Sequence, residues 1–190
     1  RSLRLLIDAD RSLNTDQQQA AASLALRVYL LRDALAFHAP ALDTTRLAML
    51  GAEAGSHTLQ QHARLANVHP PELRTHDRFG RRVDQVEFHP SYHALMGSAL
   101  AHGLHGTPWA LAAPGAHVER AAGFMLFTEA EPSVLCPVSM SYAVAPALRG
   151  NAALQAAWAP KLAAASRFCR TVRPAKVTVQ MKMDTKGPRK

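Results

Sequence analysis

Apolar residues recur every three or four positions over most of the chain, and this spacing predicts an all-α fold. Prolines and glycines separate the periodic stretches from one another. The predicted helices cover residues 14–36, residues 43–66, a stretch from His89 to Gly103, a stretch that starts after Gly115, residues 137–148 and residues 151–168.

Local signals define the ends of the first two predicted helices. Pro40 ends the first, because proline cannot continue a helix. Asp43 or Thr44 is suited to cap the second. Gly51 and Gly55 weaken the middle of that second helix.

Two of the helices show an apolar stripe that we expect to face the core. In the helix after His89 the stripe consists of Tyr92, Leu95, Met96, Ala99 and Leu100. In the helix after Gly115 it consists of Val118, Ala121, Ala122, Met125 and Leu126.

Two regions depart from helical periodicity. Residues 67–90 are polar and rich in turn-forming residues, which predicts a long surface connection with a short extended piece at 82–88. Residues 176–181 alternate between apolar and polar side chains, which is typical of a strand.

The composition fits a folded domain. Of the 190 residues, 48% are apolar and 19% are charged, which excludes a wholly disordered chain. No segment approaches the length of a membrane span, and the first ten residues lack the features of a secretory signal. We therefore expect a cytoplasmic protein.

The positive charge is confined to one end of the chain. The net charge is +8, and residues 161–190 hold nine basic side chains against one acid, Asp184. The remaining residues carry equal numbers of the two signs. This distribution predicts a basic tail, and it argues against a basic face on the domain.

Cysteines and histidines offer only weak candidate chemistry. Cys136 lies in an apolar run, so we expect a buried core thiol. The pairs His89/His93 and His102/His105 have helical spacing, yet no third ligand stands at a recognised zinc-motif distance. We expect no metal, and histidines that are exposed or cap helices.

Two glutamates follow the apolar helix after Gly115. Glu129 and Glu131 could act as acid or base if they were buried, but the nearby Pro132 favours an exposed helix end. The sequence contains no glycine-rich phosphate loop and no nucleophile elbow. These patterns leave no catalytic residue to name.

Four blocks of sequence carry a more specific signal. They are Arg64 to Leu73 (RLANVHPPEL), Gly80 to Asp84 (GRRVD), Phe88 to Met96 (FHPSYHALM) and Leu135 to Tyr142 (LCPVSMSY). Together and in this order they resemble the N-terminal region of the AidB-type adaptive-response flavoproteins, a branch of the acyl-CoA dehydrogenase superfamily.

The resemblance implies a domain organisation. Residues 1–30 match weakly, residues 31–172 correspond to the helical N-terminal domain, and residues 173–190 form a basic tail that begins a middle β domain. Complete members add that β domain and a C-terminal bundle, and they assemble as homo-oligomers, expected to be tetramers. Because the matching pattern fades towards both ends, we expect a truncated or frame-shifted product.

The resemblance also implies a chemistry. Complete members bind FAD and oxidise acyl-CoA thioesters, with a glutamate of the C-terminal bundle as the base. Here Met183 and Asp184 occupy the place of a flavin-contacting segment as a degraded match. Ser139, Met140 and Tyr142 are the positions we expect to line the substrate cavity. We expect this chain by itself to be inactive and to retain little FAD.

Two other functions stay open at this point. This branch is linked to protection of DNA from alkylation, so the basic tail favours a DNA-associated protein. A non-catalytic helical module that associates through apolar surface is the third alternative.

Overall fold

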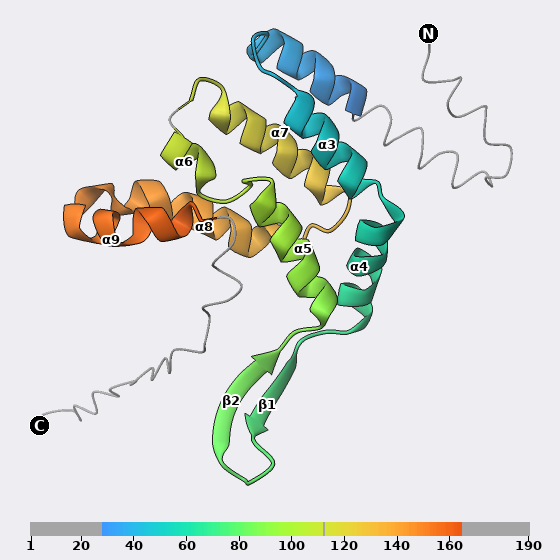
Figure 1. The fold of residues 1–190 in the computed structure, drawn as a ribbon, viewed down its shortest axis with the longest axis vertical. Coiled ribbons are helices and arrows are strands. Elements are labelled where there is room, and N and C mark those ends of the chain that lie inside the picture. Colours follow the sequence, from blue (N-terminus) through green and yellow to red (C-terminus); the bar gives the residue numbers. More distant parts are fainter. Residues whose placement is uncertain (1–27, 112, 165–190) are drawn as a thin grey trace, which may run out of the picture.

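The computed structural model describes residues 28–111 and 113–164, and Figure 1 shows a helical body from which one hairpin projects. Residues 28–38 are helical. The further elements are α3 (Thr45–Ala54), α4 (His57–Val68), β1 (Glu72–His76), β2 (Arg82–Glu87), α5 (Pro90–Ala101), α6 (Thr107–Leu111), α7 (Ala116–Thr128), α8 (Leu135–Ala147), a 3-10 turn (Leu148–Gly150) and α9 (Ala152–Leu162). None of the described helices is long and apolar enough to cross a membrane.

The long helix predicted at 43–66 is two helices. The break falls at Gly55 and Ser56, where Ser56 adopts extended backbone angles (φ −70°, ψ 145°). Its hydroxyl accepts a hydrogen bond from the Leu59 amide at 3.2 Å and so caps α4. Of the two glycines that weakened the prediction, Gly55 marks the break, whereas Gly51 lies within α3.

The predicted surface connection between α4 and α5 contains an antiparallel hairpin. The extended piece expected at 82–88 is strand β2, and β1 pairs with it. At the base of the hairpin the rings of His69 and His89 stack with their centroids 4.8 Å apart, and His62 Nδ1 lies 3.1 Å from Ser91 Oγ. These contacts join α4 to α5 side by side (Figure 1).

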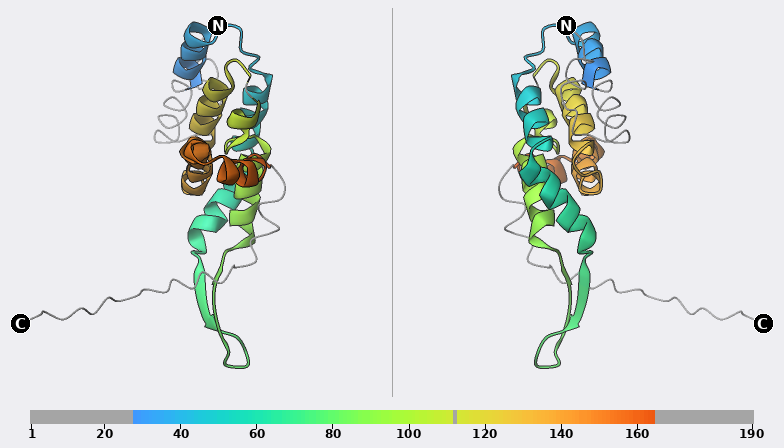
Figure 2. Two further views of the ribbon diagram at one scale, coloured as in Figure 1. Left: turned by 90° about the vertical axis from the view of Figure 1, so that its left-hand side faces the viewer. Right: turned by 90° about the vertical axis from the view of Figure 1, so that its right-hand side faces the viewer.

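The core lies where α3, α4, α5, α7 and α8 meet. Phe127 of α7 and Leu95 and Ala99 of α5 are fully buried there. Gly123 permits the close approach of the helices, because a Cβ at this position would lie 2.8 Å from Leu104 and 3.1 Å from Leu50. The side views in Figure 2 show this body as a stack of helices with the hairpin extending beyond it.

The apolar stripe predicted for α5 is confirmed, since three of its members are buried and the other two pack against the core. The stripe predicted for α7 is partly wrong. Its member Met125 is 60% exposed, whereas Phe127 is buried. The face of α7 that turns inward is centred on Ala116, Ala122, Gly123 and Phe127.

The last two described helices are α8 and α9, divided as predicted around Gly150. Asn151 caps α9 by accepting a hydrogen bond from the Leu154 amide at 3.1 Å. Cys136 is exposed, so the prediction of a buried thiol is wrong. Leu135 and Val138 fill the inward face of α8 instead. The strand-like segment 176–181 lies outside the described residues.

Candidate functional site

The three positions expected to line a cavity all lie on α8. Met140 is 65% exposed, and Ser139 and Tyr142 are half-buried. Of the three, Tyr142 is joined to other helices by aromatic contacts and hydrogen bonds. Met183 and Asp184, expected near the flavin, lie outside the described residues.

Tyr142 stands at the centre of a cluster built from α6, α7, α8 and the turn before α9. The Trp109 indole donates a hydrogen bond to the Tyr142 carbonyl at 2.9 Å, and His117 Nδ1 lies 2.8 Å from the Tyr142 hydroxyl. The guanidinium carbon of Arg120 lies 3.8 Å from the centre of the Tyr142 ring, and that of Arg149 lies 4.9 Å from the Trp109 ring. The cluster presents cations stacked on aromatic faces.

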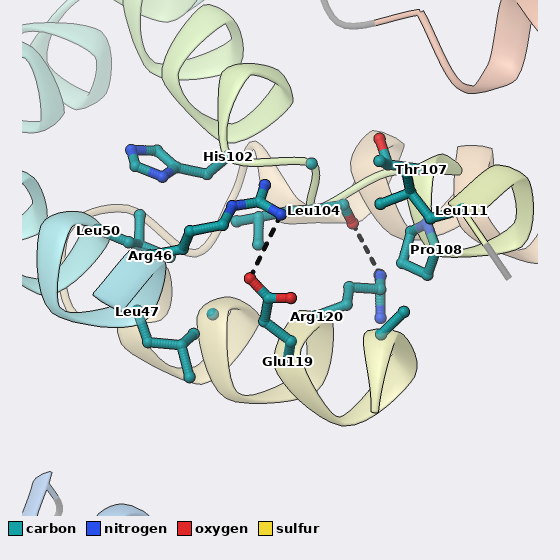
Figure 3. A pocket seen from close by; sticks show the side chains of 13 residues that line it. Arg46, Leu47, Leu50, His102, Leu104, Thr107, Pro108, Leu111, Glu119 and Arg120 are labelled. Atoms are coloured by element: carbon teal, nitrogen blue, oxygen red, sulfur yellow. Dashed lines mark hydrogen bonds and ion pairs between the residues drawn. The ribbon is translucent and has the colours of Figure 1, made fainter. Parts of the chain in front are cut away.

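Arg120 is the deepest cation of this cluster. Its Nε donates to the Leu104 carbonyl at 2.8 Å, and burial lowers the pKa of its guanidinium. Its buried Nη2 has no hydrogen-bond partner among the described residues. Figure 3 shows it beside Glu119, which pairs with Arg46 at 3.4 Å.

The cavity bordered by Arg46, Glu119 and Arg120 is small. Its volume is about 20 Å³, which accommodates one water molecule and excludes an organic substrate.

His105, which precedes α6, is 2% exposed, and its Nδ1 lacks a partner within the described ranges. Burial lowers the pKa of His105. This effect, together with the positive charge of Arg120, outweighs the opposing hydrogen bond to the Ala163 backbone and favours a neutral imidazole.

A second polar cluster joins α3 to α5. Glu53 accepts a hydrogen bond from the Ser98 hydroxyl at 2.6 Å and pairs with His102 Nε2 at 2.7 Å. Hydrogen bonds from Ser98 and then His102 lower the pKa of Glu53. This arrangement stabilises the carboxylate form and is suited to holding two helices together.

Glu131 is buried, so the expectation of an exposed helix end is wrong for this residue. Its carboxylate accepts hydrogen bonds from the Asn67 side chain and, at 2.7 Å, from the Ser133 amide. Both oxygens are thereby used to connect the end of α4 with the segment before α8. A carboxylate held in this way is a structural link between the two.

The histidines in the described ranges are not grouped as metal ligands. In the parts of the chain that the structure describes, no three side chains of His, Cys, Asp or Glu come together as metal ligands. His89 instead caps α5, because its Nδ1 accepts a hydrogen bond from the Ser91 amide at 3.2 Å. The expectation that histidines cap helices is confirmed at this position.

A larger open groove runs between the helix at 28–38 and helix α3. Its volume is about 600 Å³, and its walls are mostly apolar, with Leu31, Leu35 and Leu47 among them. The charged side chains that line it are Arg32 and Glu129. With one cation and one carboxylate among its lining residues, the groove is a poor match for the pyrophosphate of FAD, so these residues do not fit that cofactor.

Comparison with known proteins identifies relatives of this chain. The family profile described as "Adaptive response protein AidB N-terminal domain" matches residues 14–167. The putative acyl-CoA dehydrogenase AidB of Escherichia coli (strain K12) is 43% identical over 107 residues, which are 56% of this chain and 20% of the relative. The chain thus spans about a fifth of the length of this curated relative.

Two solved structures share the fold. The apo form of Bd2924 superposes with a TM-score of 0.61 at 24% identity, over 71% of this chain and 28% of that one. Caenorhabditis elegans ACDH-11, solved in complex with C11-CoA, gives a TM-score of 0.58 at 19% identity, over 71% and 24% of the two chains. These neighbours support the helical architecture.

The sequence had not singled out Trp109, Arg120 or Arg149 as partners of Tyr142. Two signals were available in the sequence. Tryptophan is rare, occurring twice in the chain, and His117 and Arg120 are spaced to lie on one helix face.

The four sequence blocks, the family profile and the fold agree with one another, and the chain belongs to the family of AidB N-terminal domains of acyl-CoA dehydrogenase-like proteins.

Proposed function

We propose that residues 31–172 serve as the helical N-terminal domain of an acyl-CoA dehydrogenase-like flavoprotein, and that α8 forms one wall of a cavity for the acyl-CoA. The observation that carries the proposal is the outer side of α8, where Met140 and Val144 are exposed beside Tyr142. Exposed apolar side chains on a helix of the matched region are suited to being covered by another domain.

In this proposal the chain binds the acyl group and shields it from water, while the remaining domains supply the reactive groups. FAD, when bound by a complete family member, would accept the hydride that the acyl-CoA loses on oxidation. Met140 would contact the acyl chain and exclude water from it, because a flexible thioether adapts to an apolar ligand. The Tyr142 hydroxyl is held by His117, so its ring would form a fixed part of the wall.

The test is reconstitution in trans. The E. coli relative, shortened by the region that this chain matches, is mixed with the purified chain in the presence of FAD. Association, flavin retention by the complex and binding of an acyl-CoA are then measured. The proposal expects flavin and acyl-CoA to be retained by the complex and not by the chain alone.

Variants make this experiment specific. Met140→Asp should weaken acyl-CoA binding by the complex by about tenfold or more. Met49→Asp is the matched control, because Met49 is exposed to a similar degree on α3. Stoichiometric flavin on the isolated chain, or equal effects of the two variants, would contradict the proposal.

DNA association is a second candidate, and the observation in its favour is the basic tail. The nine basic side chains of residues 161–190 would neutralise phosphates. We expect DNA binding that weakens steeply with salt and is lost when residues 165–190 are deleted. Deletion of residues 1–27 is the control. Salt-independent binding, or binding that survives loss of the tail, would count against this function.

A further inference from the structure

A separate cavity of about 100 Å³ lies where α6, the end of α8, the 3-10 turn and α9 meet. Figure 1 shows these elements together at one side of the helical body. Small apolar side chains make up much of the wall, with one alanine each from α6, α8 and α9 (Ala110, Ala145 and Ala159). Neither Met140 nor Tyr142 lines this cavity, so it is distinct from the wall proposed for the acyl-CoA.

The cavity depends on a glycine. A Cβ at Gly106 would lie 2.6 Å from the carbonyl oxygen of Leu162 and 3.3 Å from its Cβ. Both residues line the cavity and both are buried. A side chain at position 106 would therefore push the end of α9 away from α6 and open the cavity.

The Trp109 ring provides a fixed aromatic wall. Its Nε1 donates a hydrogen bond to the Tyr142 carbonyl at 2.9 Å, and the ring of His117 packs edge-on against it with the centroids 4.4 Å apart. Because these contacts hold the indole, a ligand that lies against it meets a preorganised surface.

Two polar side chains also line the cavity, Arg149 from the 3-10 turn and Gln155 from α9. The Arg149 guanidinium stacks on Trp109 and has no ion-pair partner within residues 28–111 and 113–164. The Gln155 side-chain amide is likewise without a hydrogen bond to the described residues. No Asp or Glu is among the described residues that line the cavity, so an anion is the complementary ligand.

The volume limits the size of that anion. An apolar cavity of about 150 Å³ binds benzene, which has six non-hydrogen atoms, so about 100 Å³ suits four or five. Acetate has four and propionate has five. Arginine binds a planar carboxylate through two parallel hydrogen bonds, whereas a tetrahedral phosphate would place polar oxygens against the apolar wall.

We propose that this cavity binds a short-chain carboxylate of two or three carbons. The carboxylate pairs with the Arg149 guanidinium and accepts a hydrogen bond from the Gln155 amide. The alkyl part lies between the Trp109 ring and the alanines of the wall. Arg149 is exposed, so it can meet the ligand from solvent.

The first test follows the two tryptophan indole signals by NMR while the full chain is titrated with sodium propionate at constant ionic strength. We expect the Trp109 signal to shift with a dissociation constant of about 1 mM. The signal of Trp158, which does not line the cavity, should stay in place, and Trp158→Phe assigns the two. Propionamide has the same size without the charge and should bind at least about tenfold more weakly.

Two pairs of variants locate the site. Arg149→Gln should weaken propionate binding by about tenfold or more. Lys161→Gln is its matched control, because Lys161 also stacks on a tryptophan, Trp158 at 4.8 Å, but lies outside the cavity.

The second pair changes the volume. Ala159→Leu should abolish binding by filling the cavity, whereas Ala156→Leu adds the same side chain to α9 away from it. Circular dichroism verifies that each variant keeps the helical content of the unchanged chain. The comparison of propionate with propionamide uses the unchanged chain and does not depend on how any variant folds.

Four results would overturn the proposal. They are a Trp109 signal that does not shift to saturation, equal affinity for propionate and propionamide, an Arg149→Gln variant that binds like the unchanged chain, and tighter binding of inorganic phosphate than of propionate. The measurement uses neither flavin nor acyl-CoA. Its outcome is therefore independent of the proposed function.

Discussion

The helical body and the hairpin of β1 and β2, here called the arm (residues 72–87), differ in how they are stabilised. In the body, Phe127 and Leu95 are fully buried and the carboxylate of Glu131 has both oxygens hydrogen-bonded. In the arm, every strand residue is exposed and Phe79 extends into solvent. The comparison teaches that the fold of this chain is determined by the body, whereas the arm is suited to contact with another molecule.

The largest predicted difference between the two regions comes from their phenylalanines. Phe127→Ala should lower the free energy of unfolding by about 3–5 kcal/mol, because it leaves a cavity in the core. Phe79→Ala should change it by about 0.5 kcal/mol or less under dilute conditions. Urea denaturation followed by circular dichroism measures both, and equal effects would refute the distinction between body and arm.

Two glutamates provide a second and smaller contrast. Glu131→Gln replaces one acceptor oxygen with a donor, so either Asn67 or Ser133 loses its buried partner, at a cost of about 1–3 kcal/mol. Glu87→Gln removes an exposed ion pair with Arg74, which contributes about 0.2–1 kcal/mol. If the exposed pair proved the more costly to lose, the assignment of Glu131 as a structural link would be wrong.

The pH dependence of stability should also arise in the body. Because the pKa of His105 is lower in the folded state than in the unfolded chain, the unfolded chain binds more protons between the two values. Stability should therefore increase as pH rises towards about 6.5 and level off above it. His105→Gln should flatten this slope, and the arm variant His76→Gln should not; thermal unfolding across the pH range distinguishes them.

The smallest effect is expected at Glu53. Its pKa is lowered in the folded state, so its contribution is present above the unfolded value of about 4.3 and is lost as pH falls through the folded value. Ser98→Ala should reduce this acid sensitivity, since the Ser98 hydroxyl is the main cause of the shift. An unchanged acid limb of the stability curve would show that the hydrogen bond has little energetic weight.

Local sequence signals predicted much of the body. The cap at His89 and the apolar stripe of α5 depend on residues close together in the chain, and both are confirmed. The shifted stripe of α7 and the burial of Glu131 were missed. Each depends on partners far away in the sequence, Asn67 for Glu131 and the α3 side chains for the glycine face of α7.

The arm was only half predicted for a similar reason. Strand β2 contains Val83 and Val86, which favour extended backbone, whereas β1 is mostly polar and becomes a strand through its pairing with β2. The position of Tyr142 came from family resemblance. Its contacts with Trp109 and Arg120 depend on how α6, α7 and α8 meet, which no local pattern encodes.

Amide hydrogen exchange tests most directly the claim that the body determines the fold and that the arm is only marginally stable. The account predicts that amides in α5 and α7 exchange only when the whole body unfolds. Arm amides, in contrast, exchange faster through local opening of the hairpin. Arm amides as strongly protected as those of α5 and α7 would contradict the account.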